Sequence, residues 1–134
     1  MCTTLVGLFS RVTKDPALKN NIKKFKEFKK LLKAKKYDEA LKAGTELLKT
    51  VPNHHDALFM MGGIYYLKNK YKTTILYLDK SLDIGAYDVD ALLLKAYSHQ
   101  KLGESKRAVS CCEKILEVDP KNTSVSELLK QLNS

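Results

Sequence analysis

The sequence predicts an all-α fold in which helix–turn–helix units stack as a repeat solenoid. The first observation is a 34-residue period, because Pro52, Ala86 and Pro120 share a column when the chain is written in rows of that length. The second is the recurrence of apolar residues at intervals of three and four, the spacing of one helix face. The third is the presence of only six glycines and three prolines, too few for a β-rich or low-complexity protein.

Composition limits the classes of protein to which the chain can belong. With 134 residues, 44% hydrophobic and 29% charged, it should form one folded domain or a short repeat array. No apolar run approaches the roughly 18 residues of a membrane span, and the LVGLF stretch is too short for a secretory signal. Cys2, Cys111 and Cys112 form no disulfide framework, so a reduced, cytoplasmic setting is expected.

Seven helices are expected from the apolar periodicity and its end signals. Asp15 before Pro16 is typical of a helix start, because Asp caps the first turn and Pro fits the first helical position. Asp56 is expected to be a turn residue and N-cap, and Ser124 with Glu127 reads as a capping box. The predicted helices cover residues 16–34, 38–49, 56–68, 72–84, 90–101, 105–117 and 124–132.

The columns of the 34-residue rows indicate how these helices pack. Gly62 stands above Ala96, and a small residue at this place lets two helices cross closely. Tyr37 and Tyr71 open the second helices of their units, and the proline column ends them, because proline cannot continue a helix. One unit cannot bury its own apolar face, whereas three stacked units can.

These columns resemble the tetratricopeptide repeat, a 34-residue helix–turn–helix unit. The turn residues Asn69 and Gly103, the small residues at the crossings, the aromatic residues and the exit prolines carry the resemblance. It implies a right-handed superhelix of three repeats and a protein that binds other polypeptides. The expected parts are an amphipathic segment over 1–14, repeats over 15–54, 55–88 and 89–122, and a capping helix over 123–134.

No arrangement typical of catalysis, of a metal site or of a cofactor site is visible, so no enzyme activity is expected. His54 and His55 are adjacent and diverge once a helix begins. His99 lies among apolar neighbours, which favours a structural role, and nearby Lys95 stands where the family has an apolar residue. In the predicted register Cys112 points inward and its neighbour Cys111 outward. Adjacent cysteines in a helix do not readily close a disulfide.

The resemblance implies that the first helix of each repeat lines a concave groove. The groove positions are mostly apolar or aromatic with lysines toward each end, which suits an amphipathic helix or an extended apolar strand of a partner. We therefore expect an adaptor that binds a partner protein. The expected groove residues are Phe25, Lys26, Lys29, Lys33, Phe59, Met60, Gly63, Tyr66, Leu93, Leu94, Tyr97 and Lys101.

One subgroup of the family holds the acidic C-terminal tails of heat-shock chaperones with a two-carboxylate clamp of Lys, Asn and Arg. The matching positions in this chain are Phe25, Lys29, Met60, Asp90 and Leu94. Only Lys29 has the required charge, so a clamp for chaperone tails is not expected.

The net charge of +9 is concentrated in the first third of the chain, where residues 1–50 hold thirteen Lys and Arg but only five acids. Part of it is a basic stripe along the first predicted helix, formed by Lys19, Lys23, Lys26, Lys30 and Lys33. Three roles stay open: a solvated outer face, a docking face for an acidic protein segment, and a contact with RNA or an anionic membrane. Nucleic acid is not favoured, because this helix has no arginine beside its aromatic residues.

The segment over residues 1–14 has the pattern of a short amphipathic helix. Leu5, Leu8, Phe9 and Val12 follow at intervals of three, one and three. Such a segment is scarcely helical alone in water, so it needs a surface. The open end of the first repeat and the groove are both available, and exchange into the groove of a second copy would make a homodimer.

Overall fold

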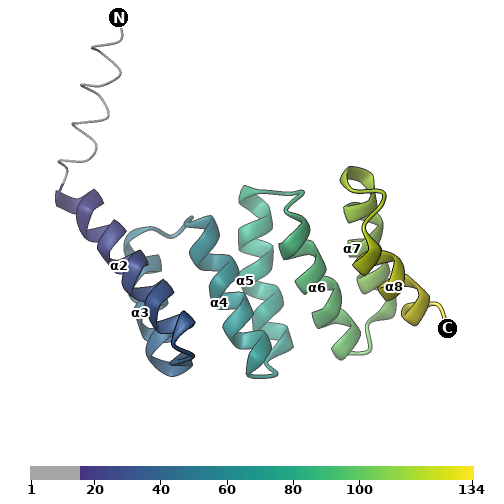
Figure 1. The fold of residues 1–134 in the computed structure, drawn as a ribbon, viewed down its shortest axis with the longest axis horizontal. Coiled ribbons are helices and arrows are strands. Elements are labelled where there is room, and N and C mark those ends of the chain that lie inside the picture. Colours follow the sequence, from purple (N-terminus) through teal and green to yellow (C-terminus); the bar gives the residue numbers. More distant parts are fainter. Residues whose placement is uncertain (1–15) are drawn as a thin grey trace, which may run out of the picture. The chain divides into compact units, whose positions relative to one another are not determined.

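The computed structural model describes residues 16–134, and the regular secondary structure of this part of the chain is entirely helical. Every helix begins and ends within one residue of its predicted bound, so the all-α prediction is confirmed. The expected cap at Asp15 and the segment 1–14 lie outside the described residues. The helices are α2 (Pro16–Lys33), α3 (Tyr37–Thr50), α4 (His55–Leu67), α5 (Tyr71–Ile84), α6 (Val89–Lys101), α7 (Ser105–Val118) and α8 (Thr123–Leu132) (Figure 1).

The chain divides into two compact units between Pro52 and Asn53. In the first unit, α2 and α3 pack against each other as a helical hairpin. Phe28 is fully buried and is the one buried residue of α2, at the place where the later repeats have Gly62 or Ala96. The small residues Ala40 and Gly44 and the larger Leu47 supply the buried face of α3.

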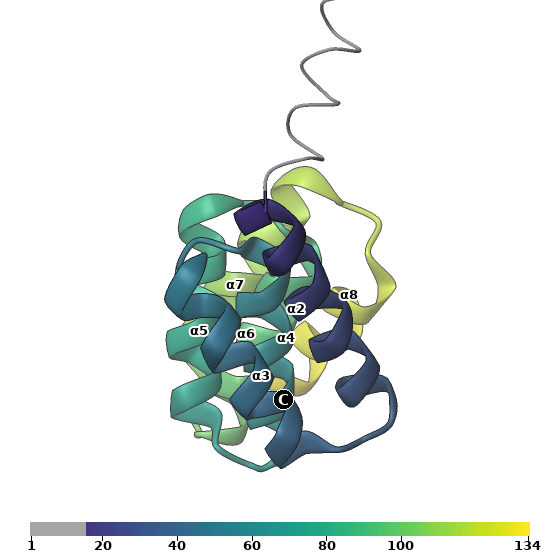
Figure 2. The same cartoon turned by 90° about the vertical axis from the view of Figure 1, so that its left-hand side faces the viewer.

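In the second unit each helix packs on the next, from α4 through α8. Figure 2 shows α5 at one edge of this unit and α4 farther toward the other edge. The last helix, α8, contributes Val125 and Leu128 to the cluster that α6 and α7 bury, which is the function expected of a capping helix. The larger buried apolar side chains of the unit are Leu58, Met61, Ile64, Leu78, Leu92, Ile115, Val125 and Leu128.

Gly62 lies where α4 crosses α5 closely. A Cβ atom built on Gly62 would lie 3.1 Å from Cδ2 of Leu78 and 3.5 Å from the carbonyl oxygen of Thr74. Contacts this short are tighter than ordinary packing allows. The absence of a side chain at Gly62 therefore sets how closely α4 approaches α5, as the sequence predicts.

The turn inside each helix pair uses a residue of positive φ. These residues are Lys35, Asn69 and Gly103, at φ of 60°, 61° and 76°, and they stand 34 positions apart. The turns at Asn69 and Gly103 were predicted. Lys35 was not, because a lysine in this conformation has no recognisable turn preference.

The first helices of the second unit are capped by the residue that precedes each of them. His54, Asp88 and Asn122 accept a hydrogen bond from the backbone N–H three residues on, at 3.2, 3.1 and 3.0 Å. The predicted cap at Asp56 is wrong, because α4 begins one residue before it at His55. The predicted capping box at Ser124 is also wrong, because Asn122 already caps α8.

Candidate functional site

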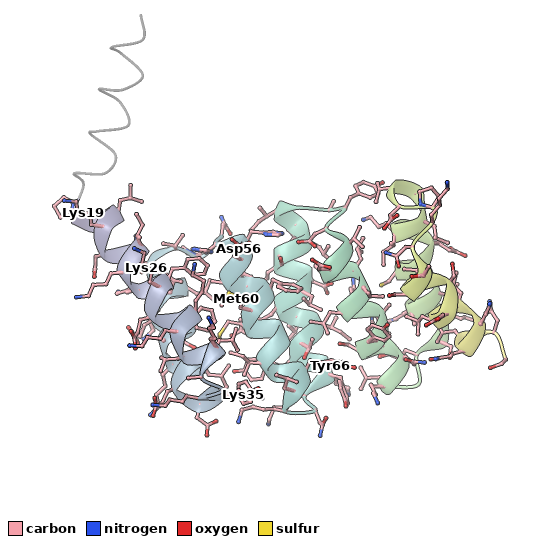
Figure 3. The ribbon with its side chains drawn as sticks, in the orientation of Figure 1. Lys19, Lys26, Lys35, Asp56, Met60 and Tyr66 are labelled. Atoms are coloured by element: carbon pink, nitrogen blue, oxygen red, sulfur yellow. The ribbon has the colours of Figure 1, made fainter. Side chains whose placement is uncertain are left out.

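The residues predicted to bind a partner in the second unit lie on α4 and α6, which contact each other directly. Within α4, Phe59 and Met60 share one side with Gly63 because they precede it by four and three residues. In α6 the corresponding residues are Leu93, Leu94 and Tyr97. Figure 3 shows Asp56, Met60 and Tyr66 following one another along α4. We call Phe59, Met60, Gly63, Tyr66, Leu93, Leu94, Tyr97 and Lys101 the first-helix face.

The apolar members of the first-helix face are neither core residues nor fully exposed. Phe59, Met60, Tyr66, Leu94 and Tyr97 are all half-buried. Half-buried large apolar side chains have more surface to lose when a second polypeptide covers them. This combination of exposure and size is typical of an interaction surface.

Tyr66 of the first-helix face packs against a tyrosine of the neighbouring helix α5. The Tyr66 ring of α4 meets the Tyr71 ring edge-to-face, with 5.4 Å between the ring centroids. Burial raises the pKa of Tyr66, and the neighbouring Tyr71 and Tyr97 hydroxyls raise it further. Tyr66 and Tyr97 stand 31 positions apart in the sequence, on the two helices of the first-helix face.

The glycine at the centre of the first-helix face adjoins open space. A Cβ atom built on Gly63 would meet no atom within 4 Å, whereas one built on Gly62 would press against Leu78. Gly63 is therefore not required for helix packing, and the backbone of α4 is accessible at this point.

In the first unit the predicted residues lie on α2. Phe25 is half-buried, and the Nζ atom of Lys29 lies 4.7 Å from the centroid of its ring, a cation–π contact. Lys26 and Lys33 are exposed, as are all members of the basic stripe. Figure 3 shows two members of the stripe, Lys19 and Lys26, on successive parts of α2.

The N-terminal ends of α4 and α6 carry carboxylates on the same side as the first-helix face. Asp56 precedes Phe59 and Met60 by three and four residues, and Asp90 precedes its α6 counterparts by the same intervals. Both aspartates are exposed. We call this pair the acidic end of the first-helix face.

A cavity that the sequence analysis did not predict lies among α5, α6 and α7. It has a volume of about 300 Å3 and continues into a neighbouring hollow that shares Asp79, Lys95, Ser110 and Cys111. Lys95, which stands at a usually apolar position, forms an ion pair with Asp79 at 2.7 Å across this space. The cavity is lined by Ile75, Asp79, Lys95, His99, Arg107, Ser110 and Cys111.

His99 is the buried ionisable residue beside this cavity. Its side chain is 4% exposed, and its Nδ1 atom lies 3.6 Å from Oε1 of Glu104. Burial lowers the pKa of His99, and Glu104 opposes this change. The imidazole is thus a packed part of the α6–α7 junction, as the sequence analysis expected.

The outward position predicted for Cys111 is wrong. Cys111 is only 7% exposed, because α7 packs with both α6 and α8 and Cys111 belongs to the buried cluster of these helices. Burial raises the pKa of Cys111 and raises that of Cys112 to about 11, so neither thiol is ionised at neutral pH. Within residues 16–134, no group of three or more His, Cys, Asp or Glu side chains could hold a metal ion.

Helix pairs repeated every 34 residues, small residues at their crossings and a final covering helix define a tetratricopeptide-repeat domain, a class of protein–protein interaction module. The model of the family described as anaphase-promoting complex, cyclosome, subunit 3 matches residues 33–115, more than half of the chain. The chain belongs to this family, which is of the tetratricopeptide type. A comparison with curated protein sequences found no match.

Several solved structures share the fold. The first TPR domain of Spaghetti (RPAP3), bound to the HSP90 peptide SRMEEVD, has 18% identity and a TM-score of 0.78 over 84% of this chain and 90% of that chain. The second TPR domain of human RPAP3, in complex with the HSP70 peptide SGPTIEEVD, has 15% identity and a TM-score of 0.79 over 88% and 98%. The TPR domain of Arabidopsis OM64 has 16% identity and a TM-score of 0.79 over 87% and 97%.

At these identities the likeness establishes the fold alone, and the chaperone peptides are ligands of the compared proteins. None of the helices in residues 16–134 is long and apolar enough to cross a membrane.

Proposed function

We propose that this chain is a non-catalytic adaptor that binds an apolar helix or extended strand of a partner protein on its first-helix face. The observation that carries this proposal is the set of half-buried aromatic and aliphatic side chains on α4 and α6, two helices that contact each other. A partner segment that covered these side chains would remove more apolar surface from water. The class of fold supports the proposal, since tetratricopeptide domains bind other proteins.

The expected ligand differs from the chaperone tails bound by the compared proteins. Three of the clamp positions fall in the second unit, where Met60 and Leu94 offer half-buried apolar surface and Asp90 offers a negative charge. A ligand carboxylate would gain nothing from the first two and would be repelled by the third. Apolar contacts are therefore the main source of affinity in this proposal.

The remaining features fit the same function. We propose that Phe25 and Lys29 make the equivalent face of the first repeat, and that the repeats cover residues 15–54, 55–88 and 89–122. A cytoplasmic setting is proposed because Cys111 and Cys112 are free, buried thiols.

Affinity capture with quantitative mass spectrometry tests the proposal. The variant F59A/Y97A removes two anchors of the first-helix face, and L76A/V118A is the matched control, because Leu76 and Val118 are exposed apolar residues of α5 and α7. We expect wild type and control to capture the same partner and F59A/Y97A to lose it, since buried aromatic anchors dominate such interfaces. Far-UV circular dichroism should show that each variant stays helical. Full capture by F59A/Y97A would place the binding surface elsewhere.

The basic stripe supports a second candidate, binding of an acidic protein, RNA or anionic membrane through α2. All five lysines are exposed, and none forms an ion pair with any side chain in residues 16–134. Repeating the capture at about 50 and about 200 mM NaCl separates the two functions, because phosphate contacts weaken steeply with salt while apolar contacts do not. A partner that K23E/K30E loses, and that salt releases, would belong to the stripe.

A further inference from the structure

Within residues 16–134, His55 is the basic side chain that lies beside the acidic end of the first-helix face. The Asp56 side chain is 72% exposed, and no Lys or Arg in residues 16–134 forms an ion pair with Asp56 or Asp90. Two other acids of the second unit do have such partners: Asp79 pairs with Lys95, and Glu104 pairs with Arg107. The two carboxylates beside the apolar face are therefore available to a ligand.

His55 lies between the start of α4 and the N-cap of α6. Its Nδ1 atom lies 3.5 Å from Oδ1 of Asp56, and its Nε2 atom lies 3.2 Å from Oδ2 of Asp88. The imidazole also lies against Gly85, where a built Cβ atom would be 3.1 Å from Nε2. Asp88 is occupied as the N-cap of α6, so Asp56 and Asp90 are the carboxylates left facing a partner.

Charge therefore varies along the first-helix face. Asp56 and Asp90 lie at the N-terminal ends of α4 and α6, the middle is apolar and aromatic, and the exposed Lys101 ends α6. A ligand that complements this order has apolar residues in its middle and a positive charge beside the aspartates.

We propose that the partner segment is an amphipathic protein segment with Lys or Arg residues at one end of its apolar stretch, which pair with Asp56 and Asp90. The inference rests on the proposed function of the first-helix face and adds the charge of the ligand. The face then selects basic-ended apolar segments over acidic-ended ones. This preference is opposite to that of a carboxylate clamp.

Synthetic peptides provide the test with the full chain. The probes are fluorescent amphipathic peptides of roughly 15 residues with identical Leu and Ala positions. In the first pair, one peptide carries two lysines and the other two glutamates at the N-terminal end of the apolar stretch. In the second pair, the same residues stand at its C-terminal end. Fluorescence anisotropy gives the dissociation constants. We expect wild type to bind the better lysine probe about tenfold more tightly than its glutamate counterpart, because two exposed attractions replace two repulsions.

Charge variants assign the preference to the acidic end. D56K/D90K should reverse it, and D56N/D90N should abolish it without reversal. The control D83K/E113K makes the same change of charge at exposed positions of α5 and α7, and should leave the preference intact. Equal binding of lysine and glutamate probes, or a preference that persists in D56N/D90N, overturns this inference and leaves the proposed function standing. Binding of neither probe, or binding that F59A/Y97A does not weaken, overturns the proposed function as well.

Discussion

Two adjacent glycines in α4 show how much the role of one residue depends on the direction in which its Cα faces. Gly62 lies at the crossing with α5, where a Cβ atom would be 3.1 Å from Leu78, and Gly63 faces open space. Both positions are interior to the same helix, so the intrinsic cost of glycine is about the same at each, roughly 0.5–1 kcal/mol relative to Ala. A difference between matched substitutions therefore measures packing alone.

We expect Gly62→Leu to lower the free energy of unfolding by about 1 to 3 kcal/mol or more, because the larger side chain must displace Leu78 and separate α4 from α5. Gly63→Leu should leave the free energy of unfolding unchanged or raise it by up to about 1 kcal/mol, because a better helix former replaces glycine. Urea denaturation followed by circular dichroism measures both. Equal effects at the two positions would show that α4 is rotated from the orientation described.

Burial of single side chains was the least predictable feature of the chain. Cys111 was expected to face outward because its neighbour Cys112 faces inward. Both thiols are buried, however, because other helices pack on two sides of α7. The cavity beside Lys95 likewise forms where three helices, α5, α6 and α7, come together. The spacing of apolar residues along a helix predicts one buried face. It therefore misses residues that are buried by a second neighbouring helix.

At the scale of the helix, the interior of each element was easier to predict than its start. The caps His54, Asp88 and Asn122 stand 34 residues apart, so the repeat contained the correct position. Serine is a common N-cap residue, which favoured Ser124 as the predicted cap of α8, but Ser124 lies inside this helix. Asn122 occupies the same position of its repeat as Asp88, so the 34-residue period favours Asn122 as the cap.

The cap of α8 gives a second prediction. Asn122→Ala should destabilise the protein by about 1 kcal/mol, the usual effect of losing an N-cap side chain, because the N–H of Val125 loses its acceptor. Ser124→Ala, at an exposed position within the helix, should change stability by less than about 0.5 kcal/mol. Thermal melts of the two variants against wild type decide between the caps. A larger loss for Ser124→Ala would restore the capping box that the sequence suggested.

At the scale of the whole chain, the repeat determined the fold and the positions of the candidate binding residues, but not their surroundings. The 34-residue period placed every helix, because each unit must repeat the same crossings to bury its apolar face. The same register placed Phe59 and Leu93 at corresponding positions of α4 and α6. It could not reveal that His55 bridges Asp56 and Asp88, because that contact depends on a side-chain conformation at the junction of two repeats.

The last prediction concerns residues 1–14, whose apolar residues need a surface. The helix α2 is the first helix of the described residues and leaves Ile22 45% exposed, which offers apolar surface to a preceding segment. We therefore expect a chain lacking residues 1–14 to be less stable by roughly 1 to 3 kcal/mol, about the contribution of burying one large apolar side chain. The conformational entropy lost when the segment becomes ordered cancels most of the stabilisation from its other apolar residues. Its mass in light scattering and its affinity for the lysine probe should not change. Tighter probe binding, or a shift from dimer to monomer, would instead show that the segment occupies the first-helix face of its own chain or of a second copy.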